Sequence, residues 1–289
     1  MRIVVVGAHG QLGGAIVREF ARGHDVVPLA RSDLDVTNDR RIAGVMQSLQ
    51  PEVIVNCAAY NDVDGAEDHP VEALTINAFA VRALAAAAAR LGAVLVHYSS
   101  DFVFDGAALA PYTERDQPNP RSVYAVSKYL GEWFAADAPK AYVLRVESLF
   151  GRPADGRPPK GTVAAICQAF VSGGAPRVFE DRTVSPTHIV DAAWATRRLV
   201  EAPAPFGIYH CVNTGCCTWL DFALEIARQL RVEPRVTRVR MSEVVLRAQR
   251  PLYCALSNDK LRALGIDMPS WRDGVRRYLT EHEHIWSRA

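Results

Sequence analysis

Two side chains with complementary acid–base chemistry, Tyr124 and Lys128, stand four residues apart in the sequence. On a helix this spacing places both on one face, close enough to act on a common target. A free tyrosine has a pKa near ~10, so it gives up its proton reluctantly at neutral pH. We expect the ammonium group of Lys128 to lower the Tyr124 pKa, because a nearby positive charge favours the phenolate. Such a tyrosine would donate its proton to an alkoxide as the alkoxide forms.

A hydroxyl group that could bind the same oxygen belongs to Ser100, which lies at the end of an apolar run at residues 93–96. The run predicts a buried strand whose carboxyl end delivers Ser99, Ser100 and Asp101. Taken alone, a Tyr-x-x-x-Lys pair is more typical of an ordinary exposed helix. A serine 24 residues before Tyr124 and a glycine-rich turn at the start of the chain change this interpretation. We therefore predict Ser100, Tyr124 and Lys128 as catalytic residues.

The glycine-rich turn contains Gly7, Gly10 and Gly13, between a β-branched run at residues 2–6 and a helical pattern at residues 14–22. Glycines allow a tight turn and a close approach of the backbone to a diphosphate, and the following helix offers free N–H groups at its N-terminus. Three glycines after a strand and before a helix indicate a dinucleotide-binding turn.

Arg31 follows the second predicted strand, residues 25–30, at its carboxyl end, where the adenosine ribose of a bound dinucleotide would lie. An arginine at this place suits a 2′-phosphate and therefore favours NADPH over NADH. The alternative is a solvated surface arginine. Asp35 and Val36 come slightly later and are expected to approach the adenine.

Strand and helix patterns alternate along the chain, which is typical of a doubly wound parallel sheet of the α/β class. Further strands are predicted at residues 52–56, 94–98, 141–145 and 206–213, and further helices at 41–49, 72–91, 124–136, 162–172, 189–201, 220–230 and 271–286. We expect residues 1–150, rejoined by residues 180–212, to form a Rossmann-type dinucleotide-binding domain. Residues 151–179 and 213–289 would form a smaller α/β substrate-binding region, with a mobile loop or lid edge at residues 152–161.

Composition limits the class of protein and its partners. The 289 residues are 49% hydrophobic and 22% charged, with a formal net charge of +1. These values are ordinary for a soluble globular protein and give no electrostatic reason to bind nucleic acid or an anionic membrane. No apolar run approaches the length of a membrane span. The six cysteines form no Cys-x-x-Cys pair and no zinc-like cluster. With no secretory signal recognised, we expect a reducing, cytoplasmic setting.

Several segments together resemble the dTDP-4-dehydrorhamnose reductase family, an extended branch of the short-chain dehydrogenase/reductase superfamily. The likeness extends over nearly the whole chain, and its most specific part is Ser-Ser-Asp-Phe-Val-Phe-Asp-Gly at residues 99–106. The other matching segments are the glycine turn at 7–13, residues 56–67, residues 123–132, Ser-Pro-Thr at 185–187 and Leu-x-x-Leu-Gly at 261–265.

The resemblance implies reduction of the 4-keto group of a nucleotide-linked 4-keto-6-deoxy-sugar by NADPH, with NADH as the alternative cofactor. It implies that Tyr124 is the proton donor, that Lys128 holds the nicotinamide ribose, and that Asp101 lies beside the sugar. Ser100 stands where the family has a threonine, which keeps the hydroxyl group. By position, the cofactor would contact Gly10, Gln11, Leu12, Asp35, Val36, Ala59, Tyr60 and Asn61.

One segment departs from the family pattern. Arg145-Val-Glu-Ser148 stands where the family usually has Arg-Thr-Ser-Trp, so Ser148 replaces the tryptophan that would contact the sugar. The identity of the sugar and the stereochemistry of the product therefore stay open. Some family members bind Mg²⁺ at a subunit interface, but we assign no carboxylate cluster of this sequence to a metal. Besides the nucleotide sugar, the expected partner is a second copy in a homodimer, although the sequence does not decide the oligomeric state.

Two alternatives remain. An epimerase or dehydratase of the same superfamily would return the hydride to the sugar, but these enzymes usually keep NAD⁺ tightly bound, and Arg31 argues against that cofactor. A non-catalytic regulatory subunit, like the one of methionine adenosyltransferase that resembles this family, would not need Ser100, Tyr124 and Lys128 intact.

Overall fold

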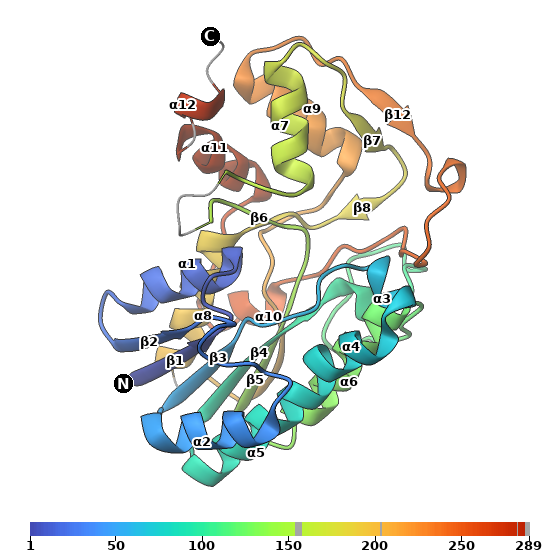
Figure 1. Cartoon of the computed structure of the whole chain (residues 1–289). Coiled ribbons are helices and arrows are strands. Elements are labelled where there is room, and N and C mark those ends of the chain that lie inside the picture. Colours follow the sequence, from blue (N-terminus) through green and yellow to red (C-terminus); the bar gives the residue numbers. More distant parts are fainter. Residues whose placement is uncertain (154–157, 203, 282, 287–289) are drawn as a thin grey trace.

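A parallel six-stranded sheet forms the centre of the computed structural model, which describes residues 1–153, 158–202, 204–281 and 283–286 (Figure 1). The strand order across the sheet is β10-β5-β4-β3-β1-β2. The strands are β1 (Arg2–Val6), β2 (Asp25–Leu29), β3 (Val53–Asn56), β4 (Val94–Ser100), β5 (Ala141–Val146) and β10 (Gly207–His210). The predicted doubly wound parallel sheet is confirmed.

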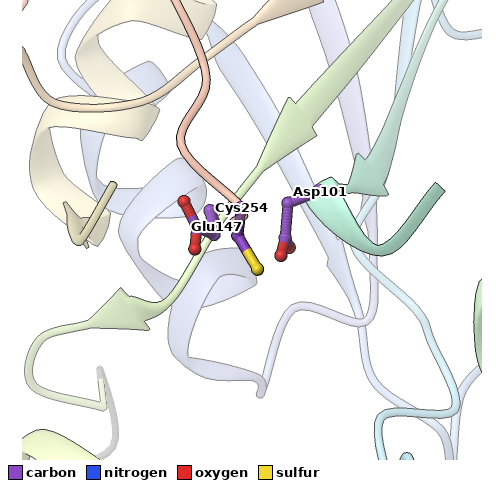
Figure 2. A group of neighbouring side chains, drawn as sticks. All are labelled: Asp101, Glu147 and Cys254. Carbon is purple, nitrogen blue, oxygen red and sulfur yellow. The ribbon is translucent and has the colours of Figure 1, made fainter. Parts of the chain in front are cut away.

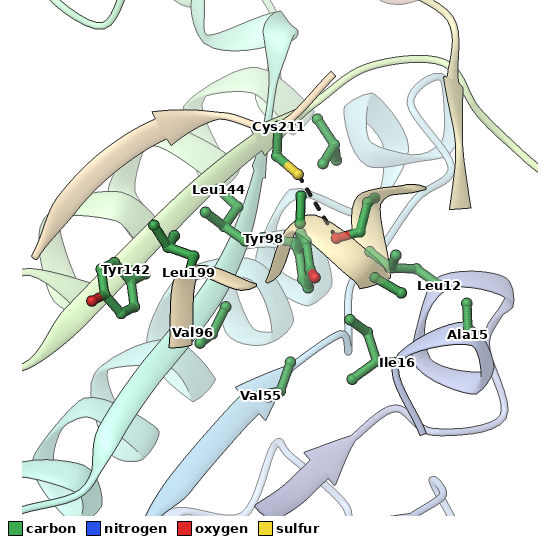
Figure 3. Close-up of a cluster of buried hydrophobic side chains, with 14 of the residues drawn as sticks. Leu12, Ala15, Ile16, Val55, Val96, Tyr98, Tyr142, Leu144, Leu199 and Cys211 are labelled. Carbon is green, nitrogen blue, oxygen red and sulfur yellow. Dashed lines mark hydrogen bonds between the residues drawn. The ribbon is translucent and has the colours of Figure 1, made fainter. Parts of the chain in front are cut away.

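Both faces of this sheet are covered by helices, which explains the continuous apolar character of its strands. In β1, Ile3 and Val5 pack in one hydrophobic core, while Val4 and Val6 pack in the core of the opposite face. The first core, part of which is drawn in Figure 3, lies under α1 (Gln11–Phe20) and α8 (Ile189–Glu201). The second lies under α2 (Asp39–Leu49), α5 (Ala80–Leu91) and α6 (Val123–Ala135).

The order of the strands creates an opening at one edge of the sheet. From β1 the chain passes to β2 on one side and then to β3 on the other. The connections that leave the carboxyl ends of β1 and β3 therefore diverge to opposite sides. In open parallel sheets, ligands bind in the crevice that results.

Two helices differ from the sequence-based expectation. α1 begins at Gln11 rather than at residue 14, so Gly13 belongs to its first turn. The long alanine-rich helix begins at Pro70 and contains a π-helical turn at Thr75–Phe79, between α4 (Pro70–Leu74) and α5. This helix is long and apolar enough to cross a membrane, with a mean hydropathy of 1.4, so the expectation that no apolar run approaches such a length is wrong. Half of its apolar window is buried inside the structure. A core helix of a globular protein has the same properties.

A further hydrophobic core lies beyond the carboxyl edge of the sheet, in the upper part of Figure 1. Its helices are α7 (Thr162–Val171), α9 (Trp219–Leu230), α11 (Trp271–Glu281) and α12 (Glu283–Trp286). Three short strand pairs accompany them: β6 (Leu149–Phe150) with β9 (Thr187–His188), β7 (Arg177–Phe179) with β12 (Thr237–Val239), and β8 (Thr183–Val184) with β11 (Cys217–Thr218).

The proposed division into two domains stays a prediction. α8 and β10 pack with the sheet, and so do Leu261, Ile266 and Met268, which come from the part of the chain assigned to the smaller region. Of the predicted loop at residues 152–161, residues 154–157 lie outside the described residues, so its role as a lid edge is also still a prediction.

Candidate active site

A cleft of about 810 Å³ opens at the carboxyl edge of the sheet, between the sheet and the further core. It brings together most of the predicted site residues, although they come from distant parts of the chain. The predicted residues that line it are Gly10, Gln11, Leu12, Gly13, Ala59, Asn61, Ser100, Asp101, Tyr124, Lys128 and Ser148.

The glycine turn forms one end of the cleft by close backbone packing. Gly7 has a φ of +77°, and a Cβ atom there would lie 2.7 Å from the backbone nitrogen of Ala58. A Cβ atom at Gly13 would lie 2.2 Å from the carbonyl oxygen of Gly7. No side chain caps the first N–H groups of α1, which begins at Gln11. The turn therefore offers backbone donors and the positive end of a helix dipole, which fit the diphosphate of a dinucleotide.

The segment after β3 is held beside this turn by Asn77, which lies in the π-helical turn and is fully buried. The Asn77 side chain accepts a hydrogen bond from Tyr60 N at 2.9 Å and donates to Tyr60 O at 3.0 Å. It also donates to the Ser127 hydroxyl on α6 at 2.9 Å. This clamp fixes the backbone on either side of Tyr60 and so places Ala59 and Asn61 in the wall of the cleft.

Tyr124 and Lys128 lie in the first two turns of α6, where the Ser122 hydroxyl caps the helix by accepting from Ala125 N at 3.2 Å. Both side chains are buried and both line the cleft, as their spacing of four residues predicts. The Tyr124 ring packs edge-on against Phe102, with ring centroids 5.5 Å apart. The phenol is thus held in one orientation by packing.

Ser100 ends β4 and reaches the cleft from the sheet side. Its hydroxyl donates to Asp101 Oδ1 at 2.7 Å and accepts from Phe102 N at 3.2 Å. Ser100, Tyr124 and Lys128 therefore meet in one cleft with the glycine turn, an arrangement that could bind a dinucleotide and protonate an oxygen beside it.

The electrostatics around Tyr124 contradict one expectation. Burial raises the pKa of Tyr124 above its ordinary value, the Asp101 carboxylate raises it further, and a hydrogen bond with Ser100 opposes this shift. The Lys128 ammonium donates to Tyr98 O at 2.5 Å, and burial lowers the pKa of Lys128 to about 8. The predicted lowering of the Tyr124 pKa by Lys128 is therefore wrong for the protein alone: burial and Asp101 raise this pKa, and the Lys128 ammonium donates to the Tyr98 carbonyl instead. A raised pKa keeps the phenol protonated at neutral pH, the state that a proton donor requires.

Other predicted cofactor residues do not line the cleft. Gly7 and Tyr60 lie directly behind its wall, where they position their neighbours. Arg31 and Asp35 are exposed beyond the carboxyl end of β2, and Val36 is half-buried. Hydrogen bonds from Thr37 hold the pKa of Asp35 below its usual value, and Arg31 contributes in the same direction. Contacts of Arg31, Asp35 and Val36 with an adenosine group thus stay predictions.

Several charged residues of the cleft were missed by the sequence analysis: Glu147, Lys160, Arg182 and Arg250. Arg250 comes from far along the chain and bonds Asp64 at 2.9 Å, a pairing without a local sequence signal. Glu147 stands inside the segment that departs from the family pattern, which was the one available signal. Glu147, Asp101 and Cys254 form a buried group whose ligand-type atoms lie within 4.8 Å of one another, although no metal ligands were predicted (Figure 2).

Comparison with known proteins shows the family of the chain. The sequence model of the family described as "RmlD substrate binding domain" matches residues 1–284. The chain belongs to the dTDP-4-dehydrorhamnose reductase family. The chain is 34% identical to a dTDP-4-dehydrorhamnose reductase of Burkholderia thailandensis over 293 residues, which cover 95% of this chain and 97% of the relative.

Solved structures of similar proteins share the fold of this family member throughout. A dTDP-4-dehydrorhamnose reductase of Clostridium acetobutylicum is 34% identical, with a TM-score of 0.91 over 98% of this chain and 100% of the other. The Bacillus anthracis reductase, solved in complex with NADP, is 33% identical, with a TM-score of 0.89 over 97% of this chain and 99% of the other. The chain therefore shares the fold of these reductases over nearly its whole length.

Proposed function

We propose that this protein reduces the 4-keto group of a nucleotide-linked 4-keto-6-deoxy-sugar with NADPH. The observation that carries the proposal is the convergence of Ser100, Tyr124 and Lys128 in one cleft that ends at the glycine turn. The relatives named as dTDP-4-dehydrorhamnose reductases, one of them in complex with NADP, support the reaction and the cofactor.

In this proposal, the residues of the cleft divide the work between binding and proton transfer. The backbone of the glycine turn and the N-terminus of α1 hold the diphosphate of NADPH, which supplies the hydride when bound. Ser100, once its hydroxyl turns from Asp101 Oδ1, and Tyr124 donate hydrogen bonds to the ketone oxygen as negative charge develops there. Tyr124 then transfers its phenolic proton to that oxygen. Lys128, freed from the Tyr98 carbonyl, holds the nicotinamide ribose.

The protonation state of Tyr124 suits this direction of reaction. An alkoxide is a far stronger base than a phenolate, so it takes the proton even from a phenol whose pKa is raised by burial. Asp101 contributes to the raised pKa and thereby helps to keep the donor protonated. A cytoplasmic setting, favoured by six cysteines that are all free, and a homodimer belong to the same proposal as expectations.

The experiment follows the absorbance of NADPH while the purified protein is mixed with dTDP-, GDP- or UDP-linked 4-keto-6-deoxy-sugars. Stoichiometric loss of NADPH with one of these sugars supports the proposal. Product formation without net loss of NADPH would instead indicate an epimerase or dehydratase. The absence of turnover with every sugar, together with copurification of a larger partner enzyme, would indicate a regulatory subunit.

A further inference from the structure

A pair of buried carboxylates lies at the carboxyl edge of the sheet beside the predicted catalytic residues. β4 and β5 are neighbours, and Ser100 is paired with Val146 in their register. Asp101 and Glu147 directly follow this pair, so both leave the sheet at the same level. Each is 2% exposed, and both line the cleft.

Each carboxylate has one bonded oxygen and one free oxygen. Asp101 Oδ1 accepts from the Ser100 hydroxyl at 2.7 Å, and Glu147 Oε2 accepts a short hydrogen bond from Ser185 N. Asp101 Oδ2 and Glu147 Oε1 are buried and accept no well-formed hydrogen bond from the described residues, although the Cys254 thiol lies close enough to Asp101 to lower its pKa. Buried polar atoms are rarely left unpaired in folded proteins, so two such oxygens in the wall of a cleft indicate a missing ligand group.

The surroundings of the pair argue against a metal ion as that ligand. Arg182 lines the same part of the cleft, is 8% exposed and donates to Cys254 Sγ at 3.5 Å, so a positive charge is already present. Burial raises the pKa of Glu147 well above its usual value, with Asp101 contributing, and burial also raises the pKa of Asp101. Metal ligands must be deprotonated, whereas this pair tends to retain a proton.

A hydroxyl group meets the requirements of such a pair. A hydroxyl both donates and accepts, and a carboxyl–carboxylate pair offers an acceptor and a donor in return. Within the proposed function, Ser100 binds the ketone oxygen, so the neighbouring Asp101 and Glu147 would lie close to a ring carbon next to the ketone. Of the two such carbons, C3 carries a hydroxyl, whereas C5 carries the methyl group of a 6-deoxy-sugar. Ser148, whose φ of +42° is unusual for a residue other than glycine, turns the chain away directly after Glu147.

We infer that Glu147, together with Asp101, forms a subsite for the sugar hydroxyl next to the ketone, at C3, and makes this enzyme selective for sugars that keep that hydroxyl. The inference rests on the proposed function and names its substrate class. A site built to bond a substrate hydroxyl rejects the analogue that lacks it, because the buried polar groups of the site are then left unpaired.

The test measures kcat/KM for a nucleotide-linked 4-keto-6-deoxy-sugar and for its 3-deoxy analogue, in the wild type, Glu147→Ala and Glu147→Gln. We expect the wild type to prefer the hydroxylated sugar by at least about 100-fold. Glu147→Ala should reduce this ratio to about 10-fold or less, mainly through slower turnover of the hydroxylated sugar. Glu147→Gln keeps an acceptor oxygen and should retain an intermediate ratio. A purely structural role of Glu147 would slow both sugars equally and leave the ratio unchanged.

The outcomes separate this inference from the proposed function. If the wild type reduces neither sugar nor any other keto-sugar, both are overturned. If the wild type turns over the hydroxylated sugar but the substrate ratio is the same in all three proteins, only the inference is overturned. Loss of activity on chelation of metal ions would assign the carboxylate pair to a cation and would also overturn it. Thermal unfolding and NADPH binding verify that each variant is folded. If Glu147→Ala does not fold, the substrate ratio of Glu147→Gln is compared with that of the wild type instead.

Discussion

At the β1 end of the cleft the wall consists of backbone and small side chains, whereas at the β5 end it consists of buried charged side chains. The first, which we call the backbone wall, is built from one continuous turn in which Gly7 and Gly13 bring main-chain atoms into direct contact. The second, which we call the charged wall, combines Asp101, Glu147 and Arg182, which are separated widely in the sequence. Backbone donors suit a diphosphate, a group that every dinucleotide carries. Buried charges suit a particular pattern of sugar hydroxyls, because each unpaired polar atom penalises the wrong ligand.

Tyr124 lies where the two walls meet, and its loss should have the largest effect. Tyr124→Phe removes the proton donor but keeps the ring that packs against Phe102. We expect kcat to fall by about 10²–10⁴, since general acid catalysis is typically worth that much. NADPH binding should change little, because the glycine turn is untouched. Steady-state kinetics and an NADPH titration check both; a near-native kcat would show that Tyr124 is not the donor.

The charged wall should depend on Arg182 for its stability. Arg182→Leu leaves Asp101 and Glu147 without the guanidinium that lowers their pKa values. We expect the free energy of unfolding to fall by on the order of 3 kcal/mol at about pH 7, since one partner of a buried charged group is removed.

This loss should shrink at lower pH. The pKa values of both carboxyl groups are already raised by burial and rise further without Arg182, so the folded state holds protons that the unfolded chain releases. Stability then decreases as pH rises from the unfolded pKa toward the folded one, and the loss should be smaller at about pH 5 than at about pH 7. Urea unfolding at both pH values measures it. Arg228→Leu is the control, because it breaks an ion pair with Glu225 in which the arginine side chain is 70% exposed. It should lower the free energy of unfolding by less than about 1 kcal/mol at either pH.

The close packing of the backbone wall should depend on Gly13 having no Cβ atom. In Gly13→Ala the new Cβ would lie 2.2 Å from Gly7 O, so the turn must shift, with a loss of about 1–3 kcal/mol in stability and weaker NADPH binding. Gly44→Ala is the matched control, because Gly44 also lies in a helix but has no atom within 4 Å of its Cβ position. The control should gain about 0.4–1 kcal/mol. If thermal unfolding and NADPH titration give the two variants the same behaviour, close backbone contact does not define this wall.

The smallest expected effect lies outside the cleft, at Arg31. If its guanidinium binds the 2′-phosphate, Arg31→Ala should raise the KM for NADPH about 10-fold and leave that for NADH unchanged, as for the loss of one hydrogen bond to a charged group. Kinetics with both cofactors measure the ratio. An equal change for both would make Arg31 an ordinary surface residue and confine cofactor recognition to the backbone wall.

The sequence predicted the backbone wall of the cleft but not the charged wall. The glycine turn was predictable because its residues are adjacent and their role is set by local backbone geometry. Tyr124 and Lys128 were placed correctly on one face of α6 by helical spacing alone. Glu147 and Arg182 were missed, because their proximity depends on the pairing of β4 with β5 and on segments that return from the further core.

By itself, the sequence determined the parallel sheet, the glycine turn and the position of the tyrosine–lysine pair, since strand and helix periodicity are local properties of the chain. The tertiary structure decided the pKa of Tyr124, which burial and Asp101 raise although a lysine stands one helical turn away. It also decided that two carboxylates, a thiol and a guanidinium share one buried space. Desolvation and charge–charge distances arise only when distant segments pack together, so neither could be obtained from residue spacing.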